Sequence, residues 1–108
     1  MPYINETDRK VLDRYIDDLS DTITNCSDEL SNENVMTVLG DLNYCVSRLF
    51  GKVMGDTSYA KVAMLTGVLE NIKQEFYRRV AVPYEEEKIV MNGDIKEYKN
   101  RHLTGKHR

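Results

Sequence analysis

Apolar residues recur every three or four positions along most of the chain, which is the period of an α-helix with one buried face. The first stretch places four of them on one such face: Leu12, Ile16, Leu19 and Ile23. Asn5 and Thr7, residues that cap helix N-termini, precede this stretch. The turn-favouring segment NCSDELSN follows it. The pattern therefore predicts a first helix over about residues 8–24.

A second stretch keeps the helical period from a start near residues 32–34. Its apolar positions are Val35, Val38, Leu39, Leu42, Val46, Leu49, Phe50 and Val53. Gly40 interrupts this stretch at a cost of about 1 kcal/mol relative to alanine. Either the helix begins at Asp41, or another group packs against Gly40. Gly51 and Gly55 are expected to mark its end.

A third helix is predicted after Ser58, which can cap it. Its apolar stripe consists of Val62, Leu65, Leu69, Ile72, Phe76 and Val80. Pro83 is expected to end this helix, because proline lacks an amide proton and crowds the preceding turn. The same proline suits the start of a shorter fourth helix, PYEEEKIVMNGD. The glutamates in its first turn are stabilised by the helix dipole. Asn92 and Gly93 supply its C-terminal cap.

No stretch alternates apolar and polar residues with a period of two, so no sheet is predicted. The expected fold is all-α, an antiparallel bundle of three long helices plus a short fourth helix and a basic C-terminal tail. With 108 residues, we expect a single helical domain over residues 1–94 and a poorly ordered tail over 95–108. At this size, association into a homo-oligomer would help stability.

Charge is unevenly distributed about a formal total of −3. The segment after Asp94 contains five basic residues and one acidic residue, Glu97, a net charge of +4. Such a tail is either a solvated terminus or a nucleic-acid contact, and the first interpretation is favoured.

The sequence contains no predicted membrane segment and no predicted metal-binding or disulfide pattern of cysteines. No apolar run approaches the roughly 20 residues that span a bilayer, and the N-terminus lacks an apolar signal segment, so a cytoplasmic protein is expected. Cys26 and Cys45 have no metal-ligand spacing and are expected to be reduced thiols.

The end of the third helix concentrates groups that bind anions. Arg78 and Arg79 carry planar guanidinium forks that suit phosphate, and Tyr77 and Tyr84 offer rings and hydroxyls for a base. The competing interpretation is that the arginines only complement the helix C-terminus.

Asn43 and Asn71 lie beside small residues on the second and third helices. They are either satisfied amides at close helix contacts, or part of a polar groove that would supply amide hydrogen bonds to the same ligand.

Enzyme chemistry is not predicted. His102 and His107 both fall in the tail, and there is no glycine-rich phosphate loop, nucleophile elbow or zinc spacing. Glu70 and Glu75 are five apart and do not share a helix face, so they do not form a magnesium-binding carboxylate pair. We expect no catalytic residue, no metal and no cofactor.

The chain resembles a family of small, largely uncharacterised helical proteins encoded by tailed bacteriophages and some bacteria. The resemblance rests on MPYI at the start, GDLNY at 40–44, GVLENIKQEFYRRVAVPYEEEKI at 67–89 and NGD at 92–94. It covers about two thirds of the chain and supplies no catalytic residue. The segment after Asp94 is longer and more basic than the family pattern.

The resemblance implies a non-enzymatic binding protein that acts in the host cytoplasm. The leading hypothesis is sequestration of a small anionic nucleotide signal of host defence, with Arg78 and Arg79 on phosphate. The alternative is a helical protein-interaction module that inhibits or scaffolds a host or phage protein.

Overall fold

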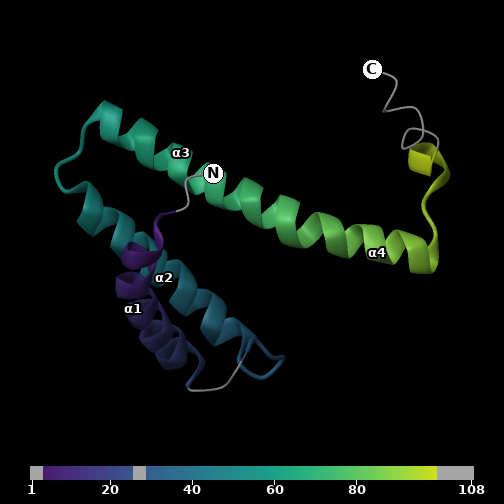
Figure 1. The fold of residues 1–108 in the computed structure, drawn as a ribbon, viewed down its shortest axis with the longest axis horizontal. Helices are drawn as coiled ribbons and strands as arrows, with labels where there is room; N and C mark the ends of the chain where they lie inside the picture. Colours follow the sequence, from purple (N-terminus) through teal and green to yellow (C-terminus); the bar gives the residue numbers. More distant parts are fainter. Residues whose placement is uncertain (1–3, 26–28, 100–108) are drawn as a thin grey trace. The chain divides into compact units, whose positions relative to one another are not determined.

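The computed structural model describes residues 4–25 and 29–99, and these ranges contain helices and no strand. Their elements are α1 (Glu6–Thr24), α2 (Val35–Met54), α3 (Tyr59–Phe76), the π-helical segment η1 (Tyr77–Ala81) and α4 (Val82–Asn92) (Figure 1). The predicted all-α class is confirmed. The chain divides into two compact units, one up to Gly55 and one from Asp56.

Helix α1 begins two residues earlier than predicted, because Asn5 caps it. The Asn5 side chain accepts a hydrogen bond from the Asp8 amide at 2.9 Å, which satisfies a first-turn N–H that has no partner within the helix. At the other end Asn25 adopts the left-handed conformation, with φ of 56°, and its N–H bonds to the carbonyls of Asp21 and Thr22. Asparagine tolerates this conformation better than most residues, and the helix stops there.

Helix α2 begins at Val35 and contains Gly40, so the expected break before Asp41 does not occur. No heavy atom lies within 4 Å of the position that a Cβ of Gly40 would take. Gly51 is also inside the helix, so the prediction that it marks the end is wrong. The hydrogen-bonded turns on both sides outweigh the cost of about 1 kcal/mol for a helical glycine. The helix ends instead at Gly55, whose φ is 66° and whose N–H bonds to the Gly51 carbonyl at 3.3 Å.

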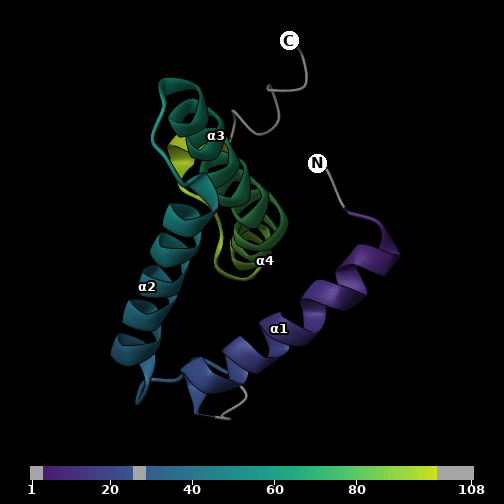
Figure 2. The ribbon, with the colours of Figure 1, turned by 90° about the vertical axis from the view of Figure 1, so that its left-hand side faces the viewer.

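Helices α1 and α2 form a hairpin, and Asn34 bonds to two residues of the connection between them. The Asn34 side chain accepts from the Ser31 amide at 2.7 Å and donates to the Glu29 carbonyl at 3.3 Å. Near this connection lie Ile23 and Val38, the two buried apolar residues of the described ranges. From there the two helices diverge (Figure 2).

Helix α3 begins as predicted, with the Ser58 hydroxyl accepting from the Lys61 amide at 3.2 Å. The prediction that Pro83 ends the helix is wrong, because the helical path continues through η1 into α4. In η1 the Val82 N–H bonds to the carbonyl of Tyr77, five residues back. This wider turn lets the chain pass a proline that would otherwise clash with the carbonyl four residues back. Pro83 then lies in the first turn of α4, where proline was predicted.

Helix α4 ends at the predicted cap. Gly93 has a φ of 86°, which a glycine adopts without strain, and its N–H bonds to the Ile89 carbonyl at 2.8 Å. Beyond it residues 96–99 form a helical turn, with the amides of Tyr98 and Lys99 bonded to the Ile95 carbonyl.

The remainder of the predicted tail lies outside the described residues. It includes both histidines and three of the tail's basic residues: Arg101, His102, Lys106, His107 and Arg108. Within the described ranges, no helix combines the length and apolar character needed to span a membrane.

Candidate functional site

The π-helical segment contains three of the six predicted ligand-binding residues, Tyr77, Arg78 and Arg79. Segments of this kind are rare and occur often at functional sites. Neighbouring residues in a helix leave the axis about 100° apart, so the two guanidinium groups start on different faces.

Arg79 already engages a carboxylate. Its Nη1 lies 3.2 Å from Oε2 of Glu75, one helical turn earlier, with side-chain exposures of 61% and 21% for the arginine and the glutamate. Ion pairs this accessible to solvent contribute about 0–1 kcal/mol.

The two predicted tyrosines are both about half exposed. The Lys88 ammonium lies 5.5 Å from the centroid of the Tyr84 ring, so that ring face is engaged by a cation one turn along α4. Tyr77 belongs to η1 and Tyr84 to α4.

The two predicted amides lie on different helices of different units. Asn43 is on α2 and its side-chain oxygen accepts from the Ser47 hydroxyl at 3.5 Å, whereas Asn71 is on α3. Both are exposed, and the described residues include no buried polar side chain. The interpretation that they are interior amides is therefore not supported.

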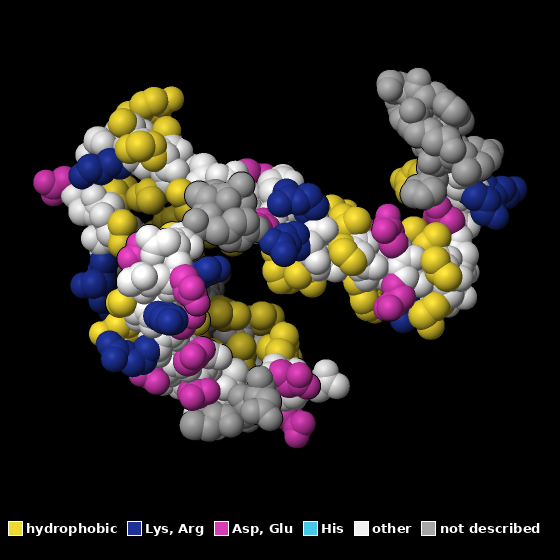
Figure 3. Space-filling model, in the orientation of Figure 1, with side chains coloured by type: hydrophobic (Ala, Val, Ile, Leu, Met, Phe, Trp, Pro, Cys, Tyr) yellow, Lys and Arg dark blue, Asp and Glu magenta, His cyan; other side chains and the backbone are white. Residues whose placement is uncertain are grey.

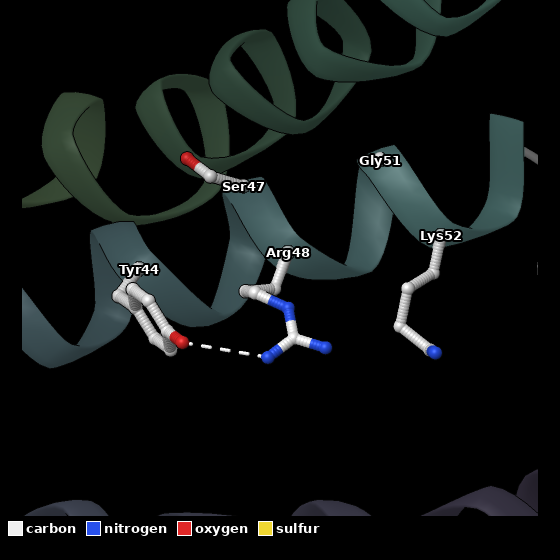
Figure 4. A pocket seen from close by; sticks show the side chains of 5 residues that line it. All are labelled: Tyr44, Ser47, Arg48, Gly51 and Lys52. Carbon is white, nitrogen blue, oxygen red and sulfur yellow. Dashed lines mark hydrogen bonds between the residues drawn. The ribbon is translucent and has the colours of Figure 1, made fainter. Parts of the chain in front are cut away.

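A shallow hollow of about 470 Å³ lies along one side of α2 (Figure 4). Its lining residues are Tyr44, Ser47, Arg48, Gly51 and Lys52. Sequence reasoning missed this group, although the signal was present: an aromatic residue and two cations spaced by four, at 44, 48 and 52. This spacing puts all three on one helix face.

Arg48 contacts Tyr44 within this hollow. Its Nη1 donates to the tyrosine hydroxyl at 3.4 Å, and its guanidinium carbon lies 6.0 Å from the centroid of the ring. The long side chain is thus kept along the helix with its fork at the hollow, as Figure 4 shows.

Two further hollows have different chemistry. One of about 330 Å³ lies at the closed end of the α1–α2 hairpin and is lined by Ile16, Ser20, Ile23, Thr24, Glu29, Leu30, Val38 and Leu42. The other, about 260 Å³, lies at the end of α4 and is lined by Glu86, Ile89, Val90 and Asp94. The six predicted residues line none of these three hollows.

Metal-ligating side chains do not gather in the described part of the chain, where no group of three His, Cys, Asp or Glu could hold an ion. Cys45 is half-buried and carries a free thiol, while Cys26 lies outside the described residues.

Comparison with known proteins places the chain in a family. The sequence profile of a family described as "Domain of unknown function (DUF6899)" matches residues 1–95. No curated protein and no solved structure matches the chain. The profile covers far more than half of the 108 residues, and the chain therefore belongs to the DUF6899 family.

Proposed function

We propose that this protein is a non-enzymatic helical binding module that associates with copies of itself through apolar helix faces and presents the assembly to a protein partner. The observation that carries this proposal is the exposure of the helix from Tyr59 to Asn92. None of its residues is buried within the unit that begins at Asp56.

The apolar stripe of this helix is too large to be left in water. Five of its side chains are between 43% and 65% exposed: Val62, Leu69, Ile72, Phe76 and Val80. Figure 3 shows hydrophobic side chains at the surface along this part of the chain. Fully burying one such side chain contributes about 1.5–3 kcal/mol, and a helix without tertiary packing is marginal in water. The stripe therefore requires another apolar face.

The same apolar stripe on a second copy of the chain is such a face. Apolar side chains at spacings of three and four allow helices to interdigitate in the antiparallel bundle that the sequence favours. The same stripe on two copies can meet about a twofold axis, which closes the assembly. The phage resemblance adds a setting, the host cytoplasm, in which such a module would inhibit or scaffold a host or phage protein.

Charge insertion into the stripe tests this proposal. Leu69→Glu should lower the molar mass measured by light scattering after size exclusion toward the 12.5 kDa of one chain. Asn71→Glu is the matched control, since it adds the same charge about 200° away around α3 and should leave the mass unchanged. A wild-type protein that elutes at 12.5 kDa would rule out self-association.

Capture of a small anionic nucleotide at η1 is the second candidate, and the π-helical geometry at Tyr77, Arg78 and Arg79 favours it. Tyr84 and Asn71 would complete the contacts. A panel of nucleotides in a thermal-shift assay tests it: stabilisation that is lost in Arg78→Gln supports this site. The absence of any shift across the panel would remove the candidate.

A further inference from the structure

The polar side of α2 lies opposite its apolar stripe. At 100° per residue, the hollow residues Tyr44, Ser47, Arg48, Gly51 and Lys52 fall within one arc of the helix. The opposite arc contains Leu42, Val46, Leu49 and Val53. Packing of the apolar stripe therefore leaves the hollow residues on the far side of α2.

Two cations stand one turn apart at this hollow. Arg48 and Lys52 are four residues apart, and like charges at that spacing repel. Across residues 4–25 and 29–99, no ion pair joins either cation to a carboxylate. An anion bound between Arg48 and Lys52 would be attracted to both cations and would offset their repulsion.

Tyr44 prepares Arg48 for such an anion. The hydrogen bond to the tyrosine hydroxyl uses one of the five guanidinium N–H groups, so most of the planar fork still faces outward. A fork of this kind binds phosphate through two parallel hydrogen bonds. The Tyr44 ring is itself exposed and provides a flat surface beside the fork.

Small residues keep the hollow open between these groups. A Cβ at Gly51 would meet no heavy atom within 4 Å, and φ at Gly51 is not positive. Neither packing nor backbone conformation requires a glycine at this position, and the same holds at Gly40 of this helix. Ser47, the other small residue, adds a hydroxyl that lies 3.5 Å from the side-chain oxygen of Asn43.

We propose that this face of α2 binds a small phosphate ester that carries a flat ring, the chemistry of a nucleotide. Arg48 and Lys52 hold the phosphate, the Tyr44 ring stacks against the flat group, and Gly51 gives it room. The hollow is shallow and open to solvent, so the ligand would lie along the surface of α2. All lining residues come from α2, so the site needs no second copy.

A plainer role for Lys52 must be distinguished from this one. Lys52 lies in the last turn of α2, where a cation stabilises the free carbonyls of the helix end. That role predicts that Lys52→Gln lowers stability and leaves binding unchanged. The phosphate site predicts weaker binding as well.

The full-length protein can be titrated with adenosine monophosphate, inorganic phosphate and adenosine, with binding followed by amide chemical shifts in two-dimensional NMR. We expect shifts at residues 44–52 with the nucleotide, weaker binding of phosphate and none of adenosine. Arg48→Gln and Tyr44→Leu should each weaken nucleotide binding by about tenfold or more. Added salt should weaken it further.

Arg14 supplies a matched control. Its guanidinium donates to the Tyr15 hydroxyl at 3.2 Å and lies 5.0 Å from that ring, yet neither residue lines any of the three hollows. Arg14→Gln should leave nucleotide binding unchanged.

Three results would overturn the proposal. The first is the absence of nucleotide-induced shifts at residues 44–52. The second is an equal loss of binding in Arg14→Gln, or a loss that follows Arg78→Gln and spares Arg48→Gln. The third is tighter binding of a single-stranded oligonucleotide than of the mononucleotide at the same residues.

Discussion

Gly40→Ala should stabilise the protein, and the size of the effect follows from the structure. Gly40 is an interior residue of α2, and a Cβ added there meets no heavy atom within 4 Å. Alanine gains about 1 kcal/mol over glycine in a helix interior, partly because the unfolded chain loses freedom. We therefore expect the free energy of unfolding to rise by about 0.5–1 kcal/mol, which corresponds to roughly 2–8 °C in Tm for a domain of this size.

Urea denaturation followed by helical circular dichroism measures this change. Protein concentration must be equal for all variants, because self-association couples to stability. Gly93→Ala is the control with the opposite sign. Gly93 has φ of 86° and ψ of 167°, a region that costs other residues about 1–3 kcal/mol, so this variant should be less stable than wild type.

A loss of stability in Gly40→Ala would refute the reasoning. It would mean that another backbone packs against Gly40, the alternative that the sequence left open, because only a close neighbour makes an added methyl group unfavourable. The side of α2 that carries Gly40 would then be an interface.

Three further substitutions test local features. Asn5→Ala removes the 2.9 Å bond to the Asp8 amide and should lower the unfolding free energy by about 1 kcal/mol in the same assay; no change would mean that the cap is not formed. Glu75→Gln breaks an ion pair whose arginine is exposed, and should lower the free energy of unfolding by less than about 1 kcal/mol, a loss that shrinks in high salt. Pro83→Ala restores a backbone N–H within the continuous helical path, and should raise stability by less than the roughly 3 kcal/mol that proline costs in a regular helix interior, because η1 already relieves the clash; a decrease would show that the proline stabilises η1.

The helices were predictable because their signals are local. Asn5, Ser58 and Gly93 act on backbone groups within four residues of themselves, so the sequence alone identifies these caps. Apolar spacing likewise identified the stripes of all three long helices. The path through Pro83 was not predictable in this way, because a helix that is stable on both sides of a proline can absorb it in a π turn.

The candidate site was only partly accessible from sequence. The predicted cluster at Tyr77–Arg79 coincides with η1, and the Arg79–Glu75 pair could have been anticipated from a spacing of four. The α2 hollow was missed because charged residues on a polar helix face are usually solvated. A bond between Arg48 and Tyr44 depends on rotamers, which residue spacing does not specify.

Sedimentation equilibrium of the wild-type protein across a dilution series tests the central claim of self-association most directly. The account predicts a molar mass that is a multiple of 12.5 kDa. Dilution should lower the molar mass and the helical circular dichroism signal together, because the Tyr59–Asn92 helix is then no longer packed against a second copy. A mass of 12.5 kDa with full helicity at every concentration would contradict the account.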